Sequence, residues 1–408
     1  MIQLPRSRGI VKAAGQRCLL LALLLPLAGC AQMAGVTEAY DSLAEYFTGK
    51  DNAEPPMELQ AIKEEIHPEV IWKDSVGDGY DERSLHLIPA LDGNRLYVAS
   101  HDGRVEARDK NSGKVIWAVD TDLPFSGGIG IGPGHLLIGT DNAEMVALRD
   151  NDGSVQWTSS VPSEVLSIPK EQKGIVVVRC TDGHVQALNA DNGSLRWHYE
   201  RPVPNLSLRV LGSPAVADGL VVDGYASGKL VALKLEDGQV QWETMVAYPR
   251  GRSEIERLVD LGGEPAVRGD TLYLVGFKGG LAAVTLSSGE VQWRIETVSG
   301  YSGPVATRRS LFLTDDDGDV WRFETSVGGD MWRQGDLHQR RVSAPVVFRD
   351  YIVVGDFEGY LHFLSQDDGH FVGRIQISKE PIVTTLIADE AQIYAYDKSG
   401  NIAAVGLH

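Results

Sequence analysis

The sequence predicts an all-β fold, an eight-bladed β-propeller made of four-stranded antiparallel blades. Three observations predict it. A unit with Pro, Gly and Trp at intervals of fourteen residues recurs along the chain, short apolar runs within each unit are separated by glycine-containing turns, and a lone outer-strand pattern precedes the first unit. The repeat leaves no room for a second domain among the 408 residues.

A tryptophan ends nearly every unit in the same register. Ala143 replaces the Gly in the second unit, and Gly373 replaces the Trp in the seventh. Seven of the eight tryptophans, all except Trp321, fall on this register, and we expect them to dock each blade on its neighbour: Trp72, Trp117, Trp157, Trp197, Trp242, Trp293 and Trp332. A buried indole at each blade junction contributes roughly 2 to 3 kcal/mol.

The ring is expected to close through the N-terminal strand. The eighth unit begins at Leu386, but the sequence stops at His408 before a Trp arrives. The segment Glu69–Trp72 has the pattern of an outer strand and no unit of its own. Pairing that strand with the last blade completes eight sheets and removes two open edges.

The fourth unit shows the four strands expected of every blade. They are predicted at Ala215–Ala217, Leu220–Tyr225, Leu230–Leu235 and Val240–Met245. Between them stand the pairs Asp218-Gly219, Ser227-Gly228 and Asp237-Gly238. Such pairs supply the positive φ that tight hairpins require.

The N-terminus resembles a bacterial lipoprotein signal. A basic stretch leads into the apolar run Leu19–Leu27, which is too short to span a bilayer, and Leu27-Ala28-Gly29-Cys30 resembles a lipobox. We therefore predict a signal peptide over 1–29, acylation with palmitate-type chains at Cys30, a lipidated tether over 30–66 and the propeller over 67–408. Ala31 in place of Asp favours the outer membrane, facing the periplasm. An ordinary signal peptide is the alternative.

Charge and cysteine content exclude several classes of function. The formal net charge is −18, and removal of the four basic residues in 1–29 makes it −18 − 4 = −22. Such a chain repels nucleic acid, so no nucleic-acid partner is expected. Cys18 leaves with the signal and Cys30 is lipidated, which excludes a disulfide framework. Cys180 is expected to be a buried strand residue and not a nucleophile.

The repeat resembles a known superfamily. Asp102-Gly103-Arg104-Val105 followed by Ser112-Gly113-Lys114-Val115-Ile116-Trp117 is similar to the tryptophan-docking repeat of pyrroloquinoline-quinone-like propellers. With the lipobox, the eight repeats and the length, the chain resembles the BamB family of the outer-membrane β-barrel assembly machinery. The resemblance implies a scaffold without a cofactor that binds the POTRA domains of BamA and assists outer-membrane proteins, including nascent ones.

Two adjacent loops are longer than the others. Eleven or twelve residues commonly separate a Trp from the next Pro position, whereas seventeen separate Trp197 from Pro214 and twenty-three separate Trp242 from Pro265. Both insertions join an outer strand to the next inner strand, so they emerge side by side on one face, and such insertions usually form a binding face.

The resemblance implies which loop positions contact the partner. These are Leu206, Leu208, Arg209, Arg257 and Asp260. Gly262 stands where family members have a second acidic residue, which leaves the acidic part of the site open. The alternative for Leu206 and Leu208 is a satellite cluster folded back on the loop.

Two other functions are less favoured. A quinone-dependent dehydrogenase would use adjacent cysteines, a Ca²⁺ site and long insertions, which this sequence lacks, so we predict that the chain is not an enzyme. Asp315–Asp319 fits a hairpin turn better than a Ca²⁺ loop, the histidines lack metal-ligand spacing, and no metal site is predicted. The remaining alternative is a lipoprotein propeller that binds another envelope ligand.

Overall fold

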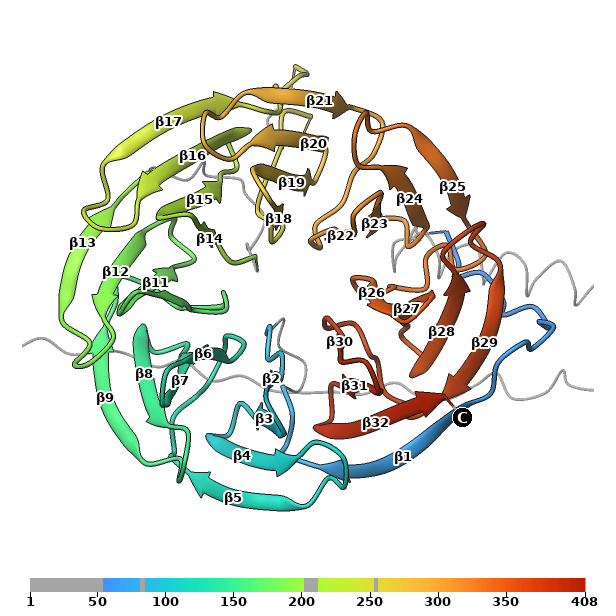
Figure 1. Cartoon of the computed structure of the whole chain (residues 1–408), viewed down its shortest axis with the longest axis horizontal. Coiled ribbons are helices and arrows are strands. Elements are labelled where there is room, and N and C mark those ends of the chain that lie inside the picture. Colours follow the sequence, from blue (N-terminus) through green and yellow to red (C-terminus); the bar gives the residue numbers. More distant parts are fainter. Residues whose placement is uncertain (1–53, 81–84, 202–211, 253–255, 408) are drawn as a thin grey trace, which may run out of the picture. The chain divides into compact units, whose positions relative to one another are not determined.

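Eight four-stranded sheets surround a central opening in the computed structural model (Figure 1). The structure describes residues 54–80, 85–201, 212–252 and 256–407. Seven blades consist of four consecutive strands that pair in chain order from the inner to the outer strand. The prediction of an eight-bladed antiparallel propeller is confirmed.

The strands are short and their bounds repeat from blade to blade. Blades 1 to 4 are formed by β2 (Ala90–Asp92), β3 (Arg95–Ala99), β4 (Arg104–Asp109) and β5 (Val115–Asp120); β6 (Gly130–Gly132), β7 (His135–Gly139), β8 (Glu144–Arg149) and β9 (Val155–Ser160); β10 (Lys170–Gln172), β11 (Ile175–Arg179), β12 (Val185–Asn189) and β13 (Leu195–Tyr199); and β14 (Ala215–Ala217), β15 (Leu220–Gly224), β16 (Lys229–Lys234) and β17 (Val240–Met245). Blades 5 to 8 are formed by β18 (Ala266–Arg268), β19 (Thr271–Gly276), β20 (Gly280–Thr285) and β21 (Val291–Ile295); β22 (Val305–Ala306), β23 (Ser310–Thr314), β24 (Val320–Glu324) and β25 (Asp330–Gln334); β26 (Val346–Phe348), β27 (Tyr351–Gly355), β28 (Tyr360–Ser365) and β29 (Phe371–Gln376); and β30 (Ile387–Ala388), β31 (Gln392–Tyr396) and β32 (Asn401–Leu407) with β1 (Pro68–Ser75).

The N-terminal strand closes the ring as predicted. β1 is the outer strand of blade 8 and runs antiparallel to β32, with Trp72 opposite Ala404. A register shift between Val70 and Trp72 marks a bulge in this pairing. Residues from opposite ends of the chain therefore share one sheet, which leaves no open gap in the ring.

Blade 4 follows the predicted strands to within one residue. β14 and β17 have the predicted bounds, and β15 and β16 end one residue earlier than expected. Asp218 and Gly219 both have positive φ, at 50° and 78°, as a hairpin of the primed type requires. Ala143 has a φ of 59°, so it adopts the left-handed conformation that a Gly adopts at the same position of most other blades.

Seven indoles join each blade to the next. In each case Nε1–H donates to a backbone carbonyl of the following blade at 2.8–3.0 Å. The pairs are Trp72 with Lys110, Trp117 with Asp150, Trp157 with Ala190, Trp197 with Leu235, Trp242 with Leu286, Trp293 with Thr325, and Trp332 with Gln366. Six of these tryptophans are the third residue of their outer strand, as Trp242 is in the predicted strand Val240–Met245, and Trp72 is the fifth residue of β1.

A glycine lies under each indole. The glycine belongs to the last hairpin of the next blade: at Gly238, φ is 72° and an added Cβ would lie 2.7 Å from a ring carbon of Trp197. The corresponding glycines under the other six rings are Gly113, Gly153, Gly193, Gly289, Gly328 and Gly369. Glycine is required there both by the backbone conformation and by the approach of the ring.

The interface between blades 7 and 8 differs from the other seven. Gly373 occupies the Trp position of β29, and an added Cβ there would lie 2.8 Å from Ile66. The amides of Glu65 and Ile66 both donate to the carbonyl of Val372, at 2.8 and 3.1 Å. We call residues Pro55–Ile66 the N-terminal strap, since this segment lies on blade 7 where an indole is absent.

The strap belongs to the same compact unit as the blades, which extends from Pro55 to His408. Leu59 and Ile62 pack against the cluster that contains Phe371. The tether was predicted over 30–66, and its described part, residues 54–66, lies against the ring. The signal peptide, Cys30 and the rest of the tether lie outside the described residues, and within the described ranges no helix is long and apolar enough to cross a membrane.

A buried ionic network in blade 7 holds the strap. Arg340 donates through Nη1 to the carbonyl of Met57 at 3.0 Å and through Nε to Asp356 at 2.9 Å. Arg374 donates through Nη1 to the carbonyl of Gln60 at 3.1 Å and through Nε to Nδ1 of His362 at 3.0 Å. Since Nδ1 accepts, Nε2–H of His362 donates to Asp356 at 3.0 Å, so the buried imidazole is neutral.

Replacement of Trp197 by Phe is expected to lower the free energy of unfolding by about 1–3 kcal/mol. The smaller ring loses the hydrogen bond to Leu235 and leaves space over Gly238. Trp321→Phe is the matched control, because it also removes an indole hydrogen bond, to Asp315 at 2.7 Å, but Trp321 is partly exposed and outside the docking register. Urea unfolding of both variants measures the difference, and equal losses would contradict a special role for the register.

Acidification is expected to destabilise the protein through His362. Burial lowers the pKa of His362 below its ordinary 6.5. The unfolded chain therefore binds this proton first, and stability is lost as the pH falls below about 6.5. Burial raises the pKa of Asp356, but hydrogen bonds from His362 and Arg340 outweigh burial and keep it below 3.8, so this carboxyl responds only at lower pH.

The measurement is the melting temperature of wild type and His362→Gln between about pH 7.5 and about pH 5. The wild type should lose more stability over this range than the variant, whose side chain does not titrate. Parallel curves would show that His362 is not the responsible group.

Candidate functional site

The two long loops meet between blades 4 and 5. The amide of Gly212, at the end of the first loop, donates to the carbonyl of Gly262 in the second at 3.0 Å. An added Cβ at Gly212 would collide with that carbonyl oxygen, so the two backbones are in close contact. Leu206, Leu208 and Arg209 lie outside the described residues, and their contact role stays a prediction.

The second loop is rooted in the core by Asp260 and its neighbours. Leu261 is fully buried and packs in one cluster with Val259 and strand residues of blades 4 and 5. Asp260 is 2% exposed, its amide donates to the carbonyl of Phe277 at 3.1 Å, and its Oδ1 accepts from the amide of Gly262 at 3.0 Å. In this structure Asp260 therefore shapes the root of the loop and does not present its carboxylate at the surface.

Arg257 and Tyr248 are both exposed, as are Arg250, Arg252 and Glu256 of the same loop. Arg257 lies in a turn at the surface. The Tyr248 ring is 53% exposed, although the guanidinium of Arg294 on β21 lies 5.1 Å from its centroid. A partly exposed aromatic ring held by a cation is a typical anchor at protein interfaces.

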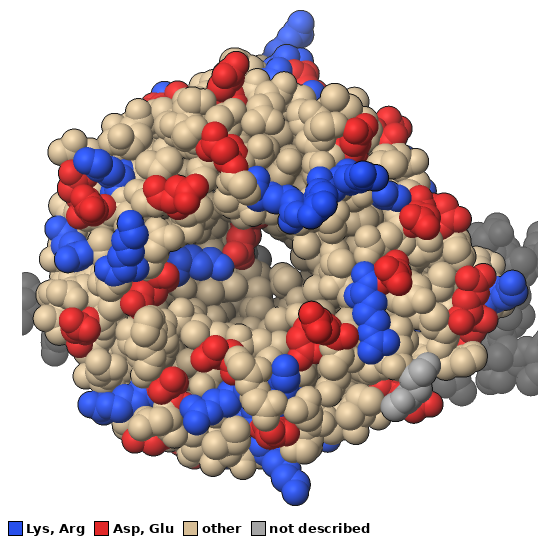
Figure 2. All heavy atoms as spheres, viewed as in Figure 1, with Lys and Arg blue, Asp and Glu red and all other residues tan. Residues whose placement is uncertain are grey.

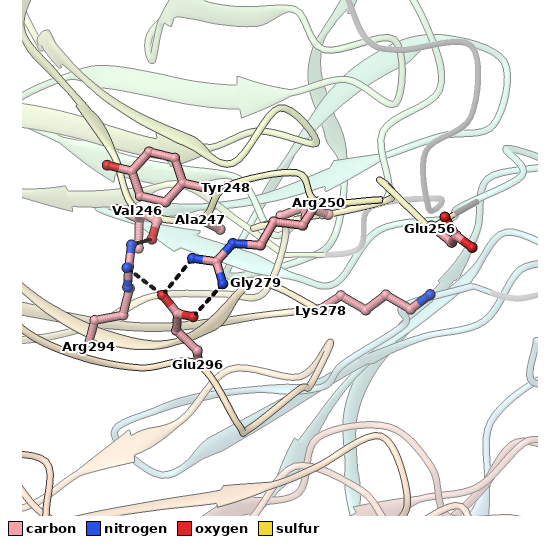
Figure 3. Close-up of a pocket in the computed structure, with 10 residues that line it drawn as sticks. Val246, Ala247, Tyr248, Arg250, Glu256, Lys278, Gly279, Arg294 and Glu296 are labelled. Atoms are coloured by element: carbon pink, nitrogen blue, oxygen red, sulfur yellow. Dashed lines mark hydrogen bonds and ion pairs between the residues drawn. The ribbon is translucent and has the colours of Figure 1, made fainter. Parts of the chain in front are cut away.

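Three charged side chains hold the loop against β21 (Figure 3). Arg294 donates to the carbonyl of Val246 at 2.8 Å and to Glu296 at 2.6 Å, and Arg250 reaches Glu296 at 3.1 Å. Arg250 and Glu296 are largely exposed, so this ion pair contributes little to stability. Its effect is to place the two arginines and Tyr248 beside one another.

We call this surface the blade 4/5 loop site, defined by Tyr248, Arg250, Arg257, Arg294 and Glu296. It borders a cavity of about 190 Å³. The charged residues that line this cavity are Arg250, Arg294 and Lys278 against Glu256 and Glu296, so the surface carries a small excess of positive charge in a chain of net charge −18. The site suits an acidic protein surface with room for an aromatic contact.

Sequence reasoning missed part of this site. Tyr248 and Arg250 stand in the second long loop but were not predicted to contact a partner. No sequence pattern pointed to Arg294 or Glu296. Their position depends on β21 lying beside the loop, which no repeat spacing reveals.

Cys180 and the acidic turn Asp315–Asp319 could suggest enzyme chemistry, but both have a structural role. Cys180 is 2% exposed, and burial raises the pKa of its thiol to about 12, which makes it a poor nucleophile. Asp315 accepts from the amide of Asp319 at 2.9 Å and from the indole of Trp321 at 2.7 Å, so it organises a turn. Within the described part of the chain, no group of three His, Cys, Asp or Glu side chains is placed to hold a metal ion.

Comparison with known proteins identifies the family. A family model described as "Outer membrane protein assembly factor BamB" matches residues 101–334. The BamB of Shewanella oneidensis is 34% identical over 367 residues, which cover 87% of this chain and 93% of that protein. The BamB of Pseudomonas aeruginosa is 37% identical, over 86% of this chain and 92% of its own. The chain belongs to the BamB family.

Solved structures agree with this family. The crystal structure of BamB from Moraxella catarrhalis superposes with a TM-score of 0.75 at 25% identity, covering 83% of this chain and all of that one. A quinohemoprotein alcohol dehydrogenase from Comamonas testosteroni superposes with a TM-score of 0.64 at 10% identity, covering 83% of this chain and 76% of that one. The dehydrogenase shares the fold alone, and the family is one of assembly factors and not of enzymes.

Asp260 provides a test of its structural role. Asp260→Ala leaves the buried amide of Gly262 without its acceptor and should cost about 1–3 kcal/mol of stability. Asp260→Asn keeps an acceptor oxygen and should cost clearly less. Urea unfolding of the two variants measures this structural role. If neither variant loses stability, Asp260 does not support the loop.

Proposed function

We propose that this protein is a lipid-anchored, non-enzymatic scaffold of outer-membrane protein assembly that holds the POTRA domains of BamA through its two adjacent long loops. The observation that carries the proposal is the blade 4/5 loop site, an exposed Tyr and Arg surface rooted in a rigid ring. Its relatives are outer membrane protein assembly factors, which supports the same process for this chain. The anchor is Cys30, in the outer membrane and facing the periplasm.

The roots of both loops support a holding function. The hydrogen bond between Gly212 and Gly262 ties the two loops together, and Leu261 fixes the second in the core. A partner that contacts both loops meets a preorganised surface, so less conformational entropy is lost on binding. A scaffold of this kind fixes the orientation of a partner domain and needs no catalytic residue.

Each contact residue has a distinct role in the proposal. Tyr248 and Leu208 provide apolar anchors, and Arg209, Arg250 and Arg257 pair with acidic groups of the partner. Asp260 acts indirectly, since its carboxylate holds the backbone of the loop. Gly262 fits this role because its amide and carbonyl both bond within the root, which leaves the acidic part of the contact to other positions.

Double substitution of Leu208 and Arg209 by Ser is expected to abolish co-purification with BamA without changing the melting temperature. Leu195 and Arg196 offer a matched control, because they are another adjacent Leu and Arg, both exposed, and stand at the start of β13, whereas the first long loop follows the end of that strand. Their double substitution by Ser should leave co-purification unchanged. BamA captured by the loop variant would remove the loops from the proposal.

The captured proteins also test the alternative function. Mass spectrometry of proteins captured from solubilised outer membranes should show subunits of the assembly machinery. A different envelope partner that is captured by wild type and lost in the loop variant would assign the same loops to another ligand.

A further inference from the structure

A polar cavity lies where the loops before the inner strands converge. Its volume is about 360 Å³, and its lining comes from the segments that precede the inner strands of blades 1, 4, 5, 6, 7 and 8. In the space-filling view the molecule is hollowed at the centre of the ring (Figure 2). Because six blades contribute to one cavity, its lining is set by the whole ring and not by any single unit.

Arg341 places a positive charge in this cavity. Among the described residues no carboxylate forms an ion pair with its guanidinium, and the side chain is exposed in the lining. Its backbone has a φ of 50°, a left-handed conformation that is unfavourable for a non-glycine residue. An unfavourable backbone conformation at a cavity-lining charge is a feature of binding sites.

The neighbours of Arg341 hold it in this conformation. Arg340 is fixed by Asp356, and Val342 is 6% exposed. Ser343 accepts from the amide of Gly355 at 2.9 Å. The residues on both sides are therefore anchored in blade 7, while the guanidinium between them stays free to meet a ligand.

Tyr80 supplies a second polar group. Its side chain is 4% exposed, it lines the same cavity, and its hydroxyl interacts with the side chain of Thr384, another residue of the lining. Burial raises the pKa of Tyr80, so the hydroxyl keeps its proton and can donate.

The rest of the lining is mixed: Lys398, in the turn between β31 and β32, adds a second positive charge, Ser302 and Thr384 add hydroxyl groups, and other residues are apolar. Leu85, Val342, Pro381 and Val383 all line the cavity. Glu264 also lines it, but its carboxylate already pairs with Lys170 at 2.8 Å. The cavity thus combines the guanidinium of Arg341 and the ammonium group of Lys398 with several hydroxyl groups and a set of apolar side chains.

We propose that the ring-centre cavity binds a carboxylate that carries a small apolar or aromatic body. The guanidinium of Arg341 can hold a carboxylate with two parallel hydrogen bonds, and Lys398 adds a second positive charge to the same cavity. The apolar walls bury the body of the ligand, and the volume lies at the lower end of the usual range for small-molecule sites. The carboxylate belongs either to the C-terminus of a peptide or to a free organic acid.

The experiment is isothermal titration calorimetry of the lipid-free mature chain with N-acetylphenylalanine and with its uncharged amide. The acid should bind saturably with a Kd of about 1 mM or below, and the amide at least about tenfold more weakly. Arg341→Gln should weaken binding of the acid by at least about tenfold. Gln is suitable because Gln339 in the same loop also has a positive φ, of 58°.

Arg349→Gln is the matched control. Arg349 is likewise an exposed arginine with a positive φ, of 54°, but it stands in the hairpin between β26 and β27 and does not line the cavity. Binding by this variant should equal that of wild type. Equal affinity for acid and amide, equal effects of the two arginine variants, or no saturable heat up to about 10 mM would overturn the proposal.

Two further ligands distinguish the sources of the carboxylate. Tighter binding of the tripeptide N-acetyl-Ala-Ala-Phe than of N-acetylphenylalanine identifies a peptide C-terminus, whereas equally tight binding of benzoate identifies a free organic acid. The inference does not rest on the proposed partner of the loops. Arg341→Gln should leave BamA co-purification unchanged, so the two proposals fail independently.

Discussion

The ring depends on one contact that is repeated seven times: an indole that lies flat on a glycine of the next blade and donates to a carbonyl beside it. The glycine is required because its φ is positive and because a Cβ would enter the ring. The indole is required because only a large flat ring with an N–H can both cover the hairpin and bond to it. Each blade is therefore positioned by its neighbour, and the ring fixes the points at which the loops begin and end.

The interface between blades 7 and 8 has no docking indole, and a different side chain fills that space. Gly373 leaves space on β29, and Ile66 of the N-terminal strap occupies it. The strap then continues along blade 7, where Arg340 and Arg374 bind its carbonyls. The same region thus receives the chain entering from the N-terminus and holds Arg341 at the ring centre, so blade 7 has two functions that no other blade combines.

The repeat made the fold predictable, because periodic glycines, turn pairs and tryptophans each follow from local geometry. Blade number, ring closure through Trp72 and the strands of blade 4 were all evident from spacing. Binding groups were harder to predict. Asp260 was expected at the surface but is buried, since its neighbour Leu261 is drawn into the core, and Arg294 belongs to the loop surface only because β21 lies beside it.

Charge makes the candidate surfaces stand out. In a chain of net charge −18, the linings of the cavities at the blade 4/5 loop site and at the ring centre each hold more cationic than acidic side chains. Excess negative charge elsewhere repels acidic partners from the wrong faces, whereas a few exposed cations favour approach to these two places. The acidic surface and the local arginines therefore act together: the first keeps the protein soluble and discourages unspecific contacts, and the second selects where an acidic partner or a carboxylate can bind.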